Sequence, residues 1–144
     1  MKLSKKGEYA LRAMIALARP VGKAMTITEV ASQQDLPKKF LEQILLALKA
    51  EGLVNSKAGP KGGYELAMQP RDITLARILA AVEEPISQEA PKSRNGAATA
   101  PAGVAAVFEE IRLFVQQKLE TISLQDLAEQ AVSKEEMEAI MWYI

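Results

Sequence analysis

The chain of 144 residues contains no cysteine and no histidine. Without thiols it can form no disulfide and offers no thiolate to a metal ion; without imidazole it lacks the commonest general base and a common transition-metal ligand. No nucleophile with a base and no paired carboxylates in a recognisable frame stand in their place. An enzyme is therefore the least supported functional class.

Long apolar runs are absent as well. The sequence has no run of roughly 18 apolar residues, the length that a membrane-spanning helix requires. The first residues, MKLSKKGEY, lack the apolar core of a signal peptide. We therefore expect a cytoplasmic protein with no membrane partner. Its length suffices for one modest domain, or a small domain with an appendage.

The formal net charge of zero hides an uneven distribution of charges. Residues 1–63 hold 11 Lys or Arg against 5 Asp or Glu, a net charge of +6, whereas residues 64–144 hold 7 against 13, a net charge of −6. A basic region of this kind is typical of polyanion binding, although a chance division of charges is the alternative. The first half is the candidate nucleic-acid-binding half.

Residues 26–66 have the outline of a winged helix-turn-helix, with two short helices, a tight turn and a hairpin. Thr26 and Glu29 stand at the spacing of a capping box, which predicts the start of the first helix. Pro37 ends that helix and begins the second. The apolar residues of the second helix follow the spacing of a core-facing stripe: Leu41, Ile44, Leu45 and Leu48.

The opposite face of the second helix carries polar side chains, and these are the candidates for reading DNA. They are Lys38, Lys39, Glu42, Gln43 and Lys49.

A hairpin is expected over residues 53–66, with a glycine-rich turn at 59–63. Such a hairpin, carrying Lys57 and Lys61, can reach a phosphate backbone or the minor groove. The alternative, a phosphate-cradling nucleotide loop, requires a lysine followed by Ser or Thr and then a helix. Lys61 is instead followed by Gly62, which disfavours that interpretation.

Helices are also expected on either side of this motif. Residues 5–18 form an amphipathic pattern with Ser4 as the N-cap, and Thr74 is placed to cap a helix running to about Val82. Lysines cluster at the start of the first helix, where they would contact phosphates or, alternatively, only solvent. They are Lys2, Lys5 and Lys6.

Residues 83–101 read as a loop, because they hold three prolines and no hydrophobic period. Apolar residues then recur at helical spacing as a wide stripe that needs a partner surface, either a second copy of the chain or the chain's own domain. The stripe comprises Val104, Val107, Phe108, Ile111, Phe114 and Val115. The predicted organisation is a DNA-binding domain over 1–83, a loop over 84–103, and a dimerisation helix with C-terminal helices over 104–144.

Several stretches together resemble the Rrf-two family of bacterial winged-helix transcription regulators: MKLSKKGEYALRAMIALA, LPKKFLEQIL, GLVNSKAGPKGGYEL, ITLARILAAVE and TISLQDL. The similarity is collinear over nearly the whole chain. It implies a mainly α fold with a small β-hairpin wing and a homodimer whose long helices cross. It further implies a repressor or dual regulator that binds a pseudo-palindromic operator in double-stranded DNA, with a role in sulfur and cysteine or in iron–sulfur and redox metabolism.

By this resemblance Glu42 and Gln43 fall where family members contact bases, with Lys38 and Lys39 before them. Gln43 would pair with an adenine edge and Glu42 would accept from cytosine N4, unless both are merely exposed helix residues. The full predicted DNA-binding set is Lys2, Lys5, Lys6, Thr26, Lys38, Lys39, Glu42, Gln43, Lys57, Lys61, Gly62 and Tyr64. The chain departs from the family at Ala58, which stands where relatives often carry arginine.

The resemblance also bears on a cofactor. Many relatives hold an iron–sulfur cluster on three cysteines, whose places here fall at Ala90, Gly96 and Ala102, and none of these can ligate iron. Glu8 lies where some relatives use an acidic ligand, but a carboxylate alone does not hold a cluster. We therefore predict no cofactor. The chain is either a naturally cluster-free member or one whose natural cysteines were replaced at or near these positions.

The final residues, MWYI, resemble the aromatic-Tyr-Ile ending of cluster-free cysteine-metabolism regulators in the same family. In the alternative function that this suggests, Tyr143 and the Ile144 carboxylate dock into a partner enzyme such as cysteine synthase. The competing interpretation is that Met141 and Trp142 finish packing against the core. A winged helix used only for binding proteins would likewise explain the fold without DNA.

Overall fold

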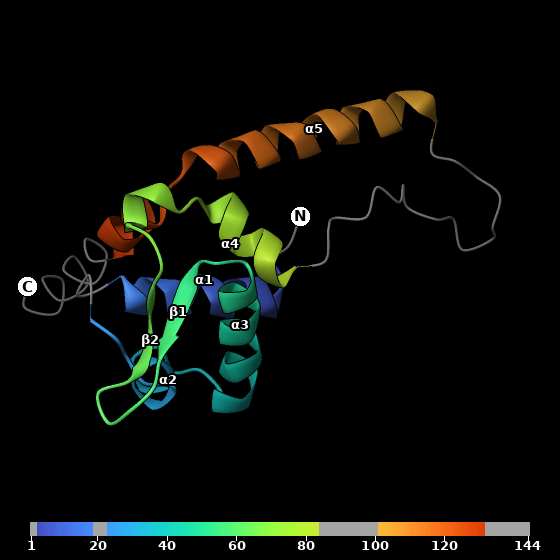
Figure 1. Ribbon diagram of the computed structural model, residues 1–144. Helices are drawn as coiled ribbons and strands as arrows, with labels where there is room; N and C mark the ends of the chain where they lie inside the picture. Colours follow the sequence, from blue (N-terminus) through green and yellow to red (C-terminus); the bar gives the residue numbers. More distant parts are fainter. Residues whose placement is uncertain (1–2, 19–22, 84–100, 132–144) are drawn as a thin grey trace, which may run out of the picture.

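The computed structural model describes residues 3–18, 23–83 and 101–131 (Figure 1). Its elements are α1 (Lys5–Leu17), α2 (Ile27–Gln34), α3 (Lys38–Ala50), β1 (Val54–Lys57), β2 (Gly63–Leu66), the 3₁₀ helix η1 (Pro70–Asp72), α4 (Leu75–Val82) and α5 (Ala102–Thr121). A further helical segment covers residues 124–131. The predicted fold class, mainly α with a small hairpin, is confirmed.

Three helices begin where their capping residues predict. The Ser4 hydroxyl accepts a hydrogen bond from the Gly7 N–H at 3.0 Å, at the start of α1. At α2 the Thr26 hydroxyl accepts from the Glu29 N–H at 3.2 Å, while the Thr26 N–H donates to the Glu29 carboxylate at 2.7 Å, a complete capping box. At α4 the Thr74 hydroxyl accepts a hydrogen bond from the Arg77 N–H. Each cap satisfies backbone donors that the first helical turn leaves unpaired.

A sharp turn joins α2 to α3. Asp35 takes a left-handed conformation with φ of 52°, and Pro37 then stands as the N-cap of α3. The residues predicted to face the core do so, since Leu41, Leu45 and Leu48 are fully buried and Ile44 is nearly so. The sequence spacing therefore sets which side of α3 faces outward.

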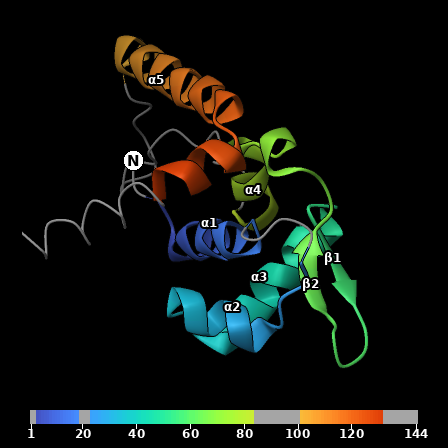
Figure 2. The same cartoon turned by 90° about the vertical axis from the view of Figure 1, so that its left-hand side faces the viewer.

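The two strands form an antiparallel hairpin that runs in register from Val54 opposite Leu66 to Lys57 opposite Gly63. An isolated bridge between Met25 and Tyr64 adds one more pairing at its outer edge. Figure 2 shows the hairpin extending beside α2 and α3, with its tip at the same end of the molecule as α2. This is the winged helix-turn-helix arrangement expected from the sequence.

One core includes residues that precede α5 and residues that follow it. The Leu75 N–H donates to the Ile122 carbonyl at 2.9 Å, and the Leu124 N–H donates to the Ile73 carbonyl at 2.8 Å. Leu124 is fully buried in the same cluster as α1, α3 and α4. Burial of a leucine side chain contributes about 1.5–3 kcal/mol. The predicted division into domains remains a prediction, but residues after α5 help to complete the N-terminal core.

The long helix α5 packs on α4 and lies at the end of the molecule opposite to α2 and the hairpin tip (Figures 1 and 2). Its observed bounds begin two residues before the predicted apolar stretch, at Ala102, which is about half a turn. Among the described residues, no helix combines the length and apolar character needed to cross a bilayer.

Candidate nucleic-acid interface

The outward face of α3 presents the predicted DNA-reading residues to solvent. Lys38, Lys39, Glu42 and Gln43 are all exposed. Within the described ranges, none of these four side chains forms an ion pair or a side-chain hydrogen bond. Their polar atoms are therefore available to an external ligand. Lys49 differs, because its Nζ donates to the Ser56 hydroxyl at 2.7 Å and ties the end of α3 to β1.

Two large apolar side chains share this outward surface. Phe40 and Leu46 are each 55% exposed. Neither residue is among the predicted DNA-reading residues, because both are apolar. Both also lie outside the buried set that begins at Leu41. The surface of α3 therefore combines charge, amide and apolar groups.

The hairpin is fixed to the helix-turn-helix through its second strand. The Met25 N–H donates to the Tyr64 carbonyl at 2.8 Å, and the Tyr64 N–H donates to the Met25 carbonyl at 2.7 Å. Gly63 has φ of 138°, and a Cβ on it would overlap the Met25 backbone, so that only glycine fits. Thr26, beside Met25, is exposed, and its hydroxyl already caps α2.

The two predicted lysines of the hairpin are in different electrostatic environments. Lys57 lies 3.1 Å from the Glu65 carboxylate on the facing strand, which offsets part of its charge. Lys61, in the turn, is exposed and makes no ion pair with any residue that the structure describes. Gly62 is buried against the backbone of the turn, and Tyr64 is half-buried against the core. Lys61 is therefore the more available cation.

The lysines at the start of α1 lie next to the end of α4 and not on the outward face of α3. Lys5 and Lys6 are exposed, while Lys2 lies outside the described residues. Beside them the Ser4 hydroxyl donates to the Glu83 carboxylate at 2.8 Å, which joins the start of α1 to the end of α4. Contact of these lysines with phosphate remains a prediction.

The apolar stripe of α5 is uncovered. Phe108 is 67% exposed and Phe114 69%, and Val104, Val107 and Ile111 are also exposed, whereas Val115 is half-buried. No residue of α5 is buried. The alternative in which the helix folds back onto its own domain would require these side chains to be covered. Within the described part of the chain, they are not.

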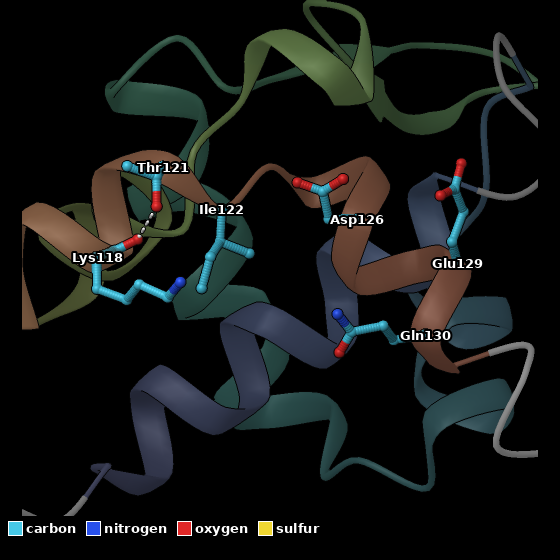
Figure 3. Close-up of a pocket in the computed structure, with 6 residues that line it drawn as sticks. All are labelled: Lys118, Thr121, Ile122, Asp126, Glu129 and Gln130. Carbon is cyan, nitrogen blue, oxygen red and sulfur yellow. Dashed lines mark hydrogen bonds between the residues drawn. The ribbon is translucent and has the colours of Figure 1, made fainter.

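An open hollow lies where α5 meets the segment 124–131, and Figure 3 shows the side chains that line it: Lys118, Thr121, Ile122, Asp126, Glu129 and Gln130. Several of its polar groups form hydrogen bonds at the end of α5 and at the start of the next helical segment. The Thr121 hydroxyl donates to the Lys118 carbonyl at 2.8 Å, and the Asp126 carboxylate accepts from the Ser123 N–H at 3.0 Å. Hydrogen bonds from the Ser123 backbone and then its side chain hold the pKa of Asp126 below its ordinary value.

Comparison with known proteins agrees with this geometry. The sequence model of the Rrf2 family, described as an iron-dependent transcriptional regulator, matches residues 3–130. The chain belongs to the Rrf2 family. The HTH-type transcriptional regulator CymR of Bacillus subtilis (strain 168) is 35% identical to it over 151 aligned residues, which cover 100% of both chains.

Solved structures of Rrf2-type regulators share its fold. CymR of B. subtilis, described as the global cysteine regulator, superposes with a TM-score of 0.76 at 31% identity, covering 90% of this chain and 98% of the other. T. potens IscR gives a TM-score of 0.76 at 30% identity, with coverages of 91% and 88%. The predicted family and fold are thereby confirmed.

The family description implies iron, and the donor set of this chain does not fit an iron–sulfur cluster. The sequence offers neither thiolate nor imidazole. The described residues also hold no group of three carboxylates close enough to share a metal ion. Ala102 begins α5, while Ala90 and Gly96 lie outside the described residues. Glu8, on α1, lies 3.6 Å from the Arg12 guanidinium.

Proposed function

We propose that this protein is a sequence-specific DNA-binding transcriptional regulator, and not an enzyme, which acts in the cytoplasm as a homodimer on a pseudo-palindromic operator. One observation carries the proposal: the outward face of α3 displays two lysines, a carboxylate and an amide that no described residue engages. The anchored hairpin beside α3 gives this helix the setting of a recognition helix.

The side chains of α3 have separate roles in this proposal. The Gln43 amide pairs with the edge of an adenine: its N–H donates to N7, and its C=O accepts from the N6 amino group. Glu42 accepts from the N4 amino group of cytosine. Lys38 and Lys39 neutralise phosphates at the start of the helix, and so contribute affinity without sequence preference.

The hairpin supplies a second contact with the duplex. Lys61 is the wing cation that reaches a phosphate or the minor groove, because Lys57 is already paired with Glu65. Thr26, Tyr64 and the backbone at Gly62 are the further wing and turn contacts of the proposal. Lys2, Lys5 and Lys6 add phosphate contacts from the N-terminal side.

Dimerisation is assigned to the exposed stripe of α5. If two copies cross along this stripe, each would bury the Phe108 and Phe114 side chains of the other. Because α5 lies opposite to α2 and the hairpin tip, the dimer contact leaves both reading helices accessible (Figure 1). Two helices related by a two-fold axis read half-sites centred about one or more helical turns apart.

The regulated process follows from similarity to CymR, a protein whose described role is cysteine regulation. We propose that the protein controls genes of sulfur and cysteine metabolism, or more broadly of iron–sulfur and redox metabolism. In this proposal the polypeptide acts without an iron–sulfur cluster. None of the comparisons supports the alternative in which the chain docks a cysteine synthase, and its residues Tyr143 and Ile144 lie outside the described residues.

A gel-shift titration tests the proposal, with the full chain and the DNA upstream of its own gene at two salt concentrations. We expect a discrete complex that resists competitor DNA and weakens steeply with salt, by roughly 0.9 in log–log slope per neutralised phosphate. A salt-insensitive interaction, or equal affinity for the upstream DNA and competitor, would contradict it.

A further inference from the structure

Phe40 and Leu46 lie in one row with Gln43 along the outward face of α3. Phe40 precedes Gln43 by three positions and Leu46 follows it by three, a spacing at which helical side chains are neighbours. Both apolar residues are more than half exposed, whereas the leucines on the other side of the helix are fully buried. The row therefore places an apolar group on either side of the candidate base-reading amide.

The charges around this row favour one kind of occupant. Lys38 and Lys39 adjoin Phe40, and neither forms an ion pair with a described residue. With the net charge of +6 over residues 1–63, they favour a polyanion over a neutral or basic protein surface. A duplex is a polyanion, and the large apolar group in its major groove is the thymine 5-methyl.

We infer that Phe40 and Leu46 read thymine methyl groups on either side of the base pair bound by Gln43. This inference rests on the proposed DNA-binding function and goes beyond it by assigning two further specificity-determining residues. Six residues of helix rise by about 9 Å, and stacked base pairs are about 3.4 Å apart. The thymines therefore lie one or two steps from the pair that Gln43 reads.

Replacing thymine by deoxyuridine tests the inference, because it removes the methyl group and leaves the pairing unchanged. The full-length protein first selects its preferred site from random DNA. Each thymine of one half-site is then replaced in turn, and affinity is measured by fluorescence anisotropy. We expect one or two replacements to weaken wild-type binding by about three- to fivefold each, from the typical free energy of burying one methyl group.

Three variants assign the effect to particular side chains. Phe40→Ala and Leu46→Ala should each lose sensitivity at one thymine and bind the deoxyuridine DNA as the wild type does. Lys39→Ala should bind all of these DNAs more weakly while keeping the wild-type ratio between thymine and deoxyuridine. Since Phe40 and Leu46 are exposed, circular dichroism should show both variants folded.

The possible failures are distinguishable. If the protein selects a site and binds it tightly but no replacement changes affinity, the methyl-reading inference is wrong and the proposed function stands. The inference is also wrong if deoxyuridine sensitivity persists unchanged in both alanine variants. It is wrong, too, if these variants bind DNA as the wild type does and lose binding to a protein instead. If no site is selected at all, the proposed function itself is contradicted, and this inference with it.

Discussion

The main chain of Tyr64 exchanges two hydrogen bonds with the main chain of Met25, at 2.8 and 2.7 Å. This pairing fixes the hairpin directly to the residue that precedes the capping box of α2. The wing and the helix-turn-helix are therefore attached to each other through the main chain, which helps to hold both elements in place for contact with the same duplex.

Gly63→Ala should break this attachment. The new Cβ would overlap the backbone of Met25, and φ of 138° is unfavourable for an L side chain, so we expect a loss of at least about 2 kcal/mol in unfolding free energy. Urea denaturation measures it. Gly103→Ala is the matched control, because its Cβ would meet nothing within 4 Å and alanine favours helices. Equal effects at the two sites would contradict the tight fit at Met25.

Truncation of two neighbouring leucines on α3 should change the unfolding free energy by very different amounts. Leu45 is fully buried and Leu46 is 55% exposed. We expect Leu45→Ala to lower the unfolding free energy by about 2–5 kcal/mol and Leu46→Ala to change it by less than about 0.5 kcal/mol. Thermal or urea unfolding of both variants provides the comparison. A large effect at Leu46 would mean that this side chain is covered, and would remove it from the DNA-facing surface.

The local features of this fold could be predicted from the sequence. Capping residues such as Ser4, Thr26 and Thr74 act on the helix that they begin, and the leucine spacing of α3 states which side is buried. These signals lie within a few residues of their effect. The family resemblance extended them to the overall fold, which the structure and the comparisons confirm.

Pairings between distant segments were not predicted. Neither the bridge of Met25 with Tyr64 nor that of Thr74 with Ser123 leaves a local pattern, because each depends on where the chain returns in space. The same holds for Leu124, whose burial depends on packing against the N-terminal core. Phe40 has no polar group, and the sequence pattern that predicts reading residues is a polar one, so its exposure on α3 is seen only in the structure. Predictions that fall on residues 132–144 lie outside the described residues.

The capping box of Ser123 and Asp126 should make stability depend on pH. Its hydrogen bonds lower the pKa of Asp126 in the folded protein, so the ionised carboxylate stabilises the fold at neutral pH. This contribution is present above the unfolded-state pKa and is lost as pH falls through the folded-state value. The stability difference between wild type and Asp126→Ala should therefore shrink between about pH 5 and pH 2.

Urea unfolding across that range, with an NMR titration of the Asp126 carboxyl, checks this expectation. Ser123→Ala removes the hydroxyl, whose hydrogen bonding is the second cause of the lowered pKa of Asp126, and should move this pKa part of the way back toward its ordinary value. A stability difference that stays constant down to pH 2 would show that the carboxylate has no role in the cap.

Phe114→Asp should dissociate the proposed dimer. The substitution places a charge near the C-terminal end of the exposed stripe of α5, where a partner helix would bury it at a large desolvation cost. Sedimentation velocity should show a monomer with unchanged helix content. Ala106→Asp, on an exposed position of the same helix outside the stripe, should remain dimeric. A monomeric wild type, or a dimer that tolerates Phe114→Asp, would contradict the role of the stripe.

The central claim is that the exposed face of α3 reads duplex DNA, and the most direct test compares Gln43→Ala with Lys39→Ala. Their affinities are measured on the selected operator and on a set of its single-base-pair variants. Gln43→Ala should lose about 1–3 kcal/mol of discrimination at one base pair, whereas Lys39→Ala should weaken binding to all sequences alike and reduce the salt slope by about 1. If the two variants bind every one of these DNAs identically, α3 is not the reading helix.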